Sequence, residues 1–161
     1  MGADDPALPH IARRINETWA DSHTYSLAET TAWLRDTAGA ASEAVFLARA
    51  GEDPVGCALL VANDLPWPAA EGPWLSSLLV EPGWRRTGIA GRLIEAVAAR
   101  AAMLGHANLY LYCVPGALAR YYATRGFAPV EPVTIDGRPY QVMKHPLAHR
   151  RPSPTNGVFR Q

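Results

Sequence analysis

Near the start of the chain, apolar residues recur among polar ones with the spacing of amphipathic helices. In the first segment the apolar positions recur every three or four residues, and they are Leu8, Ile11, Ile15 and Trp19. Asp5 and Pro6 can serve as the N-cap and the first helical residue, so the pattern predicts a helix that ends near Ala20. Ser26 precedes Glu29 by three positions, which is the arrangement of a capping box. We expect a second helix from this box to the glycine at position 39.

The pattern then changes to short apolar runs bounded by turn residues, which is typical of β-strands. Residues 44–50 and 55–62 flank a turn sequence at 51–54, so they predict a β-hairpin. Residues 63–73 contain three prolines and one glycine, and we expect them to form a loop. A third strand is expected over residues 74–80.

The second half of the chain alternates helices and strands. Residues 88–104 carry the longest helical pattern, and Gly105 follows as a stop signal. The remaining expected elements are a strand over 108–114, a helix over 117–125, a strand over 127–135 and, after an Asp-Gly turn, a strand over 140–145. This order predicts an α/β (α+β) fold in which helices flank a mixed, mostly antiparallel central sheet.

Composition indicates the number of hydrophobic cores and argues against a nucleic-acid partner. Hydrophobic residues make up 48% of the 161 positions, which is enough for one core. No repeat or linker divides the pattern, so we expect a single domain over residues 1–148. Residues 149–161 are polar and contain two prolines, and we expect a mobile C-terminal tail. The formal net charge is zero, whereas a strong basic excess is the usual footprint of a nucleic-acid binder.

The sequence also narrows the location of the protein. Residues 1–20 lack the apolar segment of a secretory signal, and no apolar run is long enough to span a bilayer. Cys57 and Cys113 lie far apart in apolar runs, which indicates two buried thiols in a reducing compartment. No spacing of ligand residues indicates a metal site. We therefore expect a cytoplasmic protein with no metal and with no membrane or nucleic-acid partner.

Glycines and arginines gather between the third strand and the longest helix. Gly88 and Gly91 leave the backbone bare where this helix begins. The first N–H groups of a helix have no partner within it, and with the positive end of the helix dipole they form an anion site. Arg85, Arg86 and Arg92 add positive charge around this site. The segment therefore predicts a binding site for a diphosphate.

Two short motifs resemble those of a known family. Arg85, Gly88 and Ala90 follow a Val-x-Pro sequence at residues 80–82, and this arrangement resembles motif A of the GNAT acetyltransferases, Arg/Gln-x-x-Gly-x-Gly/Ala. Residues 120–127 resemble their motif B, Phe-Tyr-x-x-x-Gly-Phe. The resemblance covers most of the chain. It implies a GNAT-like fold and an acyl-CoA, with acetyl-CoA as the expected donor.

The resemblance also implies which residues bind the donor. The backbone of the strand ending at Val80 would pair with the amides of pantetheine, and the N–H groups from Arg86 to Gly91 would hold the pyrophosphate. The strands containing Val80 and Asn108 would diverge and leave a slot where the thioester meets the amine. The cofactor-binding residues so implied are Leu78, Leu79, Val80, Arg85, Arg86, Thr87, Gly88, Ile89, Ala90 and Gly91.

Tyr122 matches the family position whose hydroxyl lies near the sulfur of CoA, which implies that it protonates the departing thiolate. A phenol with a pKa of about 10 can do so without ionising beforehand. The alternative is that Tyr122 only packs on the sheet, and we expect its neighbour Tyr121 to be a core residue. Pro115 stands where many relatives have an Asn, so one hydrogen bond to the cofactor would be missing.

The residue that takes a proton from the amine is left open by the sequence. Family members often place a Glu on the third strand, but residues 74–80 contain no carboxylate. Ser76 or Ser77 could position a water, and Asp64 or Glu71 could accept the proton instead. A base is not required if a small fraction of neutral amine is well positioned.

In the family, the acceptor lies between two loops that correspond to residues 20–25 and 135–140. The residues that could line the pocket or attract a cationic amine are Trp19, His23, Tyr25, Trp67, Tyr140, Asp21 and Asp64. We therefore expect an N-acetyltransferase that acts on a primary amine of a small molecule or of a peptide or protein N-terminus. The alternatives are a GNAT module that binds CoA or a partner without turnover, and an enzyme that takes its acyl group from a carrier protein. The chain could act as a homodimer.

Overall fold

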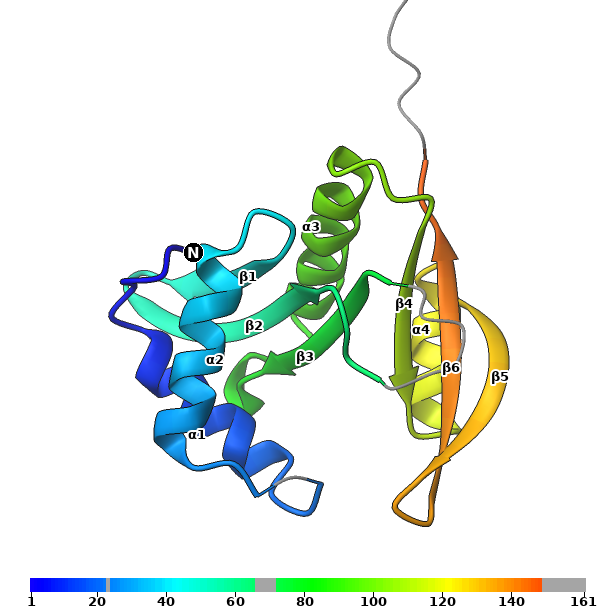
Figure 1. Ribbon diagram of the computed structural model, residues 1–161, viewed down its shortest axis with the longest axis horizontal. Helices are drawn as coiled ribbons and strands as arrows, with labels where there is room; N and C mark the ends of the chain where they lie inside the picture. Colours follow the sequence, from blue (N-terminus) through cyan, green and yellow to red (C-terminus); the bar gives the residue numbers. More distant parts are fainter. Residues whose placement is uncertain (23, 66–71, 149–161) are drawn as a thin grey trace, which may run out of the picture.

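The computed structural model describes residues 1–22, 24–65 and 72–148 (Figure 1). The predicted order of helices and strands is confirmed, with a 3-10 turn, η1, added before the longest helix. The elements are α1 (Leu8–Thr18), α2 (Leu27–Gly39), β1 (Ala44–Ala50), β2 (Asp53–Val61), β3 (Trp74–Val80), η1 (Pro82–Trp84), α3 (Ile89–Met103), β4 (Asn108–Cys113), α4 (Ala117–Thr124), β5 (Ala128–Ile135) and β6 (Arg138–Pro146). The C-terminal tail expected over 149–161 lies outside the described residues.

The two N-terminal helices form where expected, although α1 is shorter at both ends. It begins at Leu8 because the Asp5 carboxylate is engaged outside the helix. That carboxylate forms an ion pair with Arg49 at 2.8 Å, and it accepts a hydrogen bond from the backbone N–H of Ala7 at 2.9 Å. The capping box of α2 is confirmed, since Ser26 and Glu29 each accept a hydrogen bond from the other's backbone N–H.

Six strands form one sheet in the order β1-β2-β3-β4-β6-β5. The β3–β4 pair is parallel and the other neighbouring pairs are antiparallel, which confirms the predicted mixed, mostly antiparallel sheet. The second strand begins at Asp53, two residues earlier than expected, because a register shift after Ala48 lets it pair with the end of β1. The last strand begins early as well, because Ile135 pairs with Arg138 across a tight two-residue turn.

Side chains on opposite faces of the sheet pack into two apolar cores. Helices α1 and α2 contribute to one core, which includes Leu34 and Trp74, and we call this side the α1/α2 face. Helices α3 and α4 contribute to the other, which includes Val97 and Leu111 on the α3/α4 face (Figure 1). Each large apolar side chain buried in this way stabilises the fold by roughly 1.5–3 kcal/mol. The two cysteines are free and buried, as predicted.

Strands β3 and β4 stay together only where they begin. Among the described residues, Trp74 on β3 pairs with Tyr110 on β4, and the two strands diverge from there (Figure 1). Ser77 has a φ of 50°, and the register between β2 and β3 shifts beside it, as in a β-bulge. Gly56 allows the backbones of β2 and β3 to lie close together here, because a Cβ on this residue would lie 2.9 Å from the Leu79 carbonyl oxygen. The predicted divergence of these two strands is therefore confirmed.

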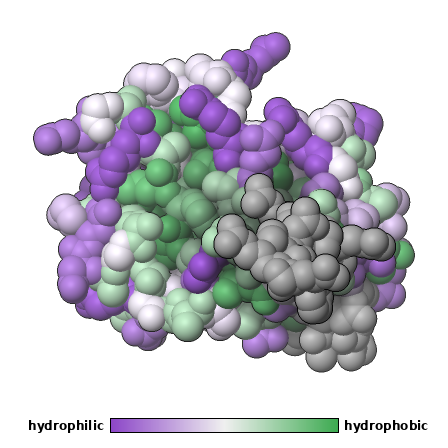
Figure 2. All heavy atoms as spheres, turned by 90° about the horizontal axis from the view of Figure 1, so that it is seen from above, coloured by the Kyte–Doolittle hydropathy of each residue, from purple (hydrophilic) through white to green (hydrophobic). Residues whose placement is uncertain are grey.

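The surface of the molecule is mixed in character. Figure 2 looks onto it from above, where hydrophilic side chains surround a region of apolar residues. Met103, in the last turn of α3, has a side chain that is 78% exposed. Within the described ranges, no helix is both long enough and apolar enough to cross a membrane.

Candidate active site

The loop that connects β3 to α3 has an unusual backbone. The chain passes through η1 and then through Arg86 and Gly88, whose φ angles of 62° and 84° both lie in the left-handed region. Such alternation turns successive N–H groups toward one side, an arrangement known as a nest that binds anions. Gly88 adopts its φ without the strain of a side chain, and a Cβ placed on it would meet no atom within 4 Å. The space beside this glycine is therefore open.

The backbone N–H groups from Arg86 to Gly91 have no acceptor among the described residues. The groups on either side of this run are paired: the Arg85 N–H donates to Pro82 at 3.4 Å, and the Arg92 N–H donates to the Gly88 carbonyl at 3.2 Å. The second of these bonds is the first one of α3. A run of unpaired N–H groups at the positive end of a helix attracts an anion, which agrees with the predicted anion site. The binding of an anion there stays a prediction.

Positive side chains surround these N–H groups. Arg85, Arg86 and Arg92 come from the loop and the first turn of α3, and none of them forms an ion pair with a described residue. The first turn of α3 contains no acidic residue. Because cations at a helix N-terminus repel the helix dipole, this cluster is unfavourable until an anion neutralises it.

Arg125, just beyond α4, joins this cluster from a distant part of the chain. Its guanidinium lies so near Gly91 that a Cβ on that glycine would be 2.6 Å from Nη1. The same guanidinium stands over the Tyr121 ring, 5.5 Å from its centroid. Arg125 was not among the site residues predicted from the sequence. The available signal was its place within motif B, together with a glycine in the first turn of α3 that leaves room for a large side chain.

One backbone edge of β3 is directed toward β4. The Glu81 N–H donates to Val55 on β2 at 2.9 Å, and backbone groups alternate sides along a strand, so those of Leu78 and Val80 point toward β4. The Val80 carbonyl already accepts a hydrogen bond from Arg85 Nε at 3.1 Å. The expected pairing with pantetheine therefore either displaces Arg85 from this carbonyl or uses the other groups of the same edge.

Tyr122 lies on the α3/α4 face near the end of β4. Its side chain is 8% exposed, and its ring packs against Phe127 with centroids 5.7 Å apart. Burial raises the pKa of Tyr122 above its usual value, and Cys113 and Tyr121 add to this rise, so the hydroxyl stays protonated at neutral pH. The expectation that Tyr121 is the core residue of this pair is wrong. Tyr121 is only partly buried because it faces the Arg125 guanidinium, while its neighbour fills the core.

A polar cluster on the other face of the sheet is built around Asp64, which follows β2. Burial raises the pKa of Asp64 to about 6, against the opposing effect of a hydrogen bond from Ser76. Ser76 on β3 is buried, and its hydroxyl lies 3.3 Å from that of Ser77. Burial and then the Asp64 charge raise the pKa of Tyr112, on β4, to about 12. Glu71, the other acid considered as a base, lies outside the described residues.

A narrow pocket of about 80 Å³ opens beside Tyr112, between the segment after α1 and the β5–β6 turn. The residues that line it include Asp21, Ser22, Tyr112, Asp136, Arg138 and Tyr140. The rings of Tyr112 and Tyr140 meet edge to face with centroids 5.5 Å apart. The structure thus brings together the two loops that were expected to frame the acceptor.

Two other aromatic residues considered for this pocket, Trp19 and Tyr25, lie in the described part of the chain and do not line it. Trp19 packs against the core beneath α1 and α2. The Tyr25 side chain is 65% exposed, and its carbonyl accepts a hydrogen bond from Asn16. His23 and Trp67 lie outside the described residues. Tyr140 is therefore the member of the predicted aromatic set that the structure places at the pocket.

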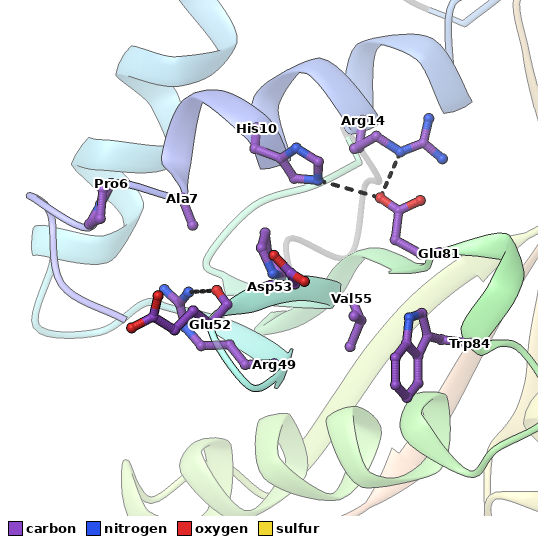
Figure 3. Close-up of a pocket in the computed structure, with 11 residues that line it drawn as sticks. Pro6, Ala7, His10, Arg14, Arg49, Glu52, Asp53, Val55, Glu81 and Trp84 are labelled. Atoms are coloured by element: carbon purple, nitrogen blue, oxygen red, sulfur yellow. Dashed lines mark hydrogen bonds and ion pairs between the residues drawn. The ribbon is translucent and has the colours of Figure 1, made fainter.

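A larger pocket of about 590 Å³ lies between α1, the β1–β2 turn and η1 (Figure 3). Arg14 and His10 of α1 both point toward the Glu81 carboxylate, with Arg14 Nε at 2.7 Å and His10 Nε2 at 3.5 Å (Figure 3). These two contacts hold α1 against the end of β3. They also offset the negative charge of Glu81, which precedes the arginine-rich loop. Neither Tyr122 nor the unpaired N–H groups line this pocket, so it is separate from the chemistry described above.

Pro115 lies in the turn between β4 and α4. The helix starts after Gly116, which has a φ of 106° and offers no side-chain cap. The expected loss of one hydrogen bond to the cofactor at this turn stays a prediction.

The fold and the anion site together define a class of protein. A mixed sheet with a diverging parallel pair, and unpaired N–H groups at the start of the next helix, are the features of an acyl-CoA-dependent N-acyltransferase. Residues 8–127 match the family model described as the acetyltransferase (GNAT) family. The chain belongs to the GNAT acetyltransferase family.

Solved structures of GNAT enzymes share this fold. An aminoglycoside 6′-acetyltransferase type Ii has a TM-score of 0.72 at 19% identity, with 94% of this chain and 97% of that chain covered. An aminoglycoside 6′-N-acetyltransferase complexed with coenzyme A has a TM-score of 0.71 at 17% identity, with coverages of 92% and 96%. The NatC complex bound to Gag peptide and CoA gives a TM-score of 0.69 at 15% identity, again with coverages of 92% and 96%.

No curated protein matches the sequence of this chain. At identities this low, the structural likeness shows the fold alone. The acceptor therefore has to be argued from the residues of this chain.

Proposed function

We propose that this enzyme transfers an acetyl group from acetyl-CoA to the primary amine of a small molecule or of a peptide or protein N-terminus. The observation that carries the proposal is the run of N–H groups from Arg86 to Gly91, which has no acceptor among the described residues. A diphosphate would supply those acceptors and would neutralise the guanidinium groups around them. Such a group lies in the middle of CoA.

The residues at the start of α3 fit the donor. The N–H groups of Arg86, Thr87, Gly88, Ile89, Ala90 and Gly91 would hold the pyrophosphate. Arg85 and Arg125 would add charge-assisted hydrogen bonds, Arg85 after release of the Val80 carbonyl. The edge of β3 formed by Leu78, Leu79 and Val80 would bind pantetheine through its backbone. When bound, acetyl-CoA supplies an activated carbonyl carbon and a thiol leaving group.

Tyr122 is the proposed acid for that leaving group. Its ring is fixed by Phe127 and Tyr121, and its raised pKa keeps the proton on the hydroxyl at neutral pH. A thiol has a pKa of about 8.5, below that of a phenol, so Tyr122 would donate a hydrogen bond to the departing sulfur and pass on its proton as the proton from the amine nitrogen replaces it. Cys113, at the end of β4, contributes to the raised pKa of Tyr122, which supports a position of this hydroxyl near the separated ends of β3 and β4.

Two other functions make different use of the same residues. An acyl donor carried by a protein would use the β3 edge but would leave the charge around Gly88 without a partner. A module that binds CoA without turnover would need neither Tyr122 nor a base. We place the reaction in the cytoplasm, because the two buried cysteines are free thiols.

The proposed function is tested by offering acetyl-CoA and a panel of primary amines and measuring the free thiol of CoA that is released. Small alkylamines, amino sugars and short peptides with a free N-terminus form the panel. Release above the rate without amine, with at least one of these acceptors, is the expected result. No release with any amine, together with tight CoA binding, would show a binding module instead.

A further inference from the structure

The last carbonyl of β3 is covered by a side chain of the chain itself. Val80 stands opposite Gly56 in the β2–β3 ladder. The next N–H along the strand, that of Glu81, donates to Val55 at 2.9 Å. Val80 and Gly56 therefore form a pair that exchanges no hydrogen bonds, so the N–H and carbonyl of Val80 point away from β2 and toward β4. The Arg85 guanidinium lies on this side, because its Nε donates to the Val80 carbonyl at 3.1 Å.

The neighbouring backbone leaves room for this contact and holds it in place. Among the described residues, β4 pairs with β3 only at the start of β3, where Trp74 lies opposite Tyr110 (Figure 1). The backbone of Arg85 is fixed at the end of η1, because its N–H donates to Pro82 at 3.4 Å. Uncovering the carbonyl therefore requires the rotation of one exposed side chain and no movement of the loop.

A pantetheine amide that pairs with the edge of β3 would need the same oxygen from the same side. A hydrogen bond from a charged donor is roughly twice as strong as one between neutral groups. Exchange of the Arg85 guanidinium for a neutral amide is therefore unfavourable unless the guanidinium gains a better partner elsewhere. It would find one in a diphosphate held by the N–H run that begins at Arg86, which is the next residue.

We infer that Arg85 selects the acyl donor, because its guanidinium covers the pantetheine edge of β3 and leaves the Val80 carbonyl only for the diphosphate of CoA. This inference rests on the proposed function, since it concerns the choice of donor at the same site. A pantetheine thioester without a diphosphate has to displace the guanidinium without that compensation. Arg85 therefore favours acyl-CoA over an acyl group that a carrier protein holds on phosphopantetheine, whose phosphodiester carries a single charge.

The neighbouring arginine provides a matched control within the same loop. Among the described residues, the Arg86 side chain has no hydrogen bond or ion pair, whereas Arg85 contacts the Val80 carbonyl. Both side chains are exposed and carry the same charge beside the N–H run. Replacing either one removes a positive charge, but only replacement of Arg85 uncovers the edge of β3.

The test replaces each arginine by methionine, which keeps a long unbranched side chain and removes its charge. Affinity is measured by calorimetry for CoA and by NMR titration for pantetheine, so the result does not depend on turnover. Arg85→Met should weaken CoA binding by about 10-fold, because a charge-assisted contact is lost. It should strengthen pantetheine binding by about 5-fold, because the Val80 carbonyl is free. The preference for CoA over pantetheine should therefore fall by about 50-fold.

The control and a third ligand sharpen the comparison. Arg86→Met should also weaken CoA binding, because it removes a charge beside the diphosphate, but its affinity for pantetheine should equal that of the wild type. The ligand 4′-phosphopantetheine reproduces the arm of a carrier protein. In the wild type its affinity should lie between those of CoA and pantetheine, and in Arg85→Met the three affinities should lie closer together. Without ligand, both variants should unfold at the temperature of the wild type, since both side chains are exposed.

The outcomes separate this inference from the proposed function. A wild type that binds no CoA would refute the proposed function. CoA binding by the wild type, together with an unchanged or lower affinity of Arg85→Met for pantetheine, would refute donor selection by Arg85 and leave the proposed function standing. An equal gain in pantetheine affinity in Arg86→Met would show that charge, and not the contact with Val80, opposes pantetheine, and would refute the inference as well.

Discussion

Replacing Gly88 with Glu should abolish the stabilisation of this protein by acetyl-CoA. The side chain would project from a position with a φ of 84° into the open space beside the unpaired N–H groups. The carboxylate would then compete with the diphosphate for these donors and would repel it. The matched control is Gly105→Glu, because Gly105 has a φ of 88°, is equally open and lies just beyond the other end of α3. Both variants carry the same new charge and a similar backbone strain, about 1–2 kcal/mol.

The expected size of the effect follows from linkage. At a ligand concentration 100 times Kd, binding stabilises the wild type by about 2.7 kcal/mol, which raises Tm by about 5–11 °C for a chain of this size. Two like charges about 4 Å apart repel by roughly 1–4 kcal/mol, depending on how well water screens them. A 100-fold loss of affinity lies within that range. It would leave about 0.4 kcal/mol of stabilisation at the same ligand concentration, a shift of about 1–2 °C.

The assay is thermal unfolding of the three proteins with and without acetyl-CoA. Without the ligand, the two variants should have similarly lowered Tm values. With it, Gly105→Glu should show the shift of the wild type and Gly88→Glu should show almost none. Equal shifts in both variants would refute the assignment of the anion site to the start of α3.

The remaining predictions concern the acid, the fourth arginine and Asp64. Tyr122→Phe should lower kcat by about 100-fold with little change in acetyl-CoA affinity, and an equal loss of both in steady-state kinetics and calorimetry would contradict its role as an acid. Arg125→Ala should weaken acetyl-CoA binding by about 10-fold in calorimetry, while Arg120→Ala within α4 should not. The folded state holds the Asp64 proton more tightly than the unfolded state, since its pKa is raised from 3.8 to about 6. The stability of the wild type relative to Asp64→Asn should therefore fall as pH rises between these values, and denaturant titrations that show no such fall would contradict the burial of this carboxylate.

The elements that the sequence predicted well are those with strong local signals. The Ser26–Glu29 capping box defined the start of α2, and β1 and β3 have the predicted bounds, because their apolar runs end at clear turn residues. The start of β2 was misplaced because it depends on a register shift in the partner strand, which no local pattern records. The start of α1 was misplaced because the Asp5 carboxylate pairs with Arg49, a residue remote in sequence.

The candidate site shows the same division between local and tertiary information. The loop around Gly88 could be predicted because its N–H groups, glycines and arginines are neighbours in the chain. Arg125 could not, because its place depends on how α4 packs against the start of α3. The sequence left Asp64 as one of several acids, and the burial that raises its pKa is a tertiary feature that no local pattern records. Burial of Tyr122 in place of Tyr121 likewise depends on the direction in which α4 faces the sheet.

The most direct measurement of the central claim follows the backbone amide signals of Arg86 to Gly91 by NMR during titration with CoA and, separately, with pantetheine, which has no phosphate. The account predicts that CoA shifts these signals strongly and slows their hydrogen exchange, and that pantetheine at matched saturation affects them far less. If CoA bound while these amides kept the shifts and exchange rates of the free protein, the proposed diphosphate site would be wrong.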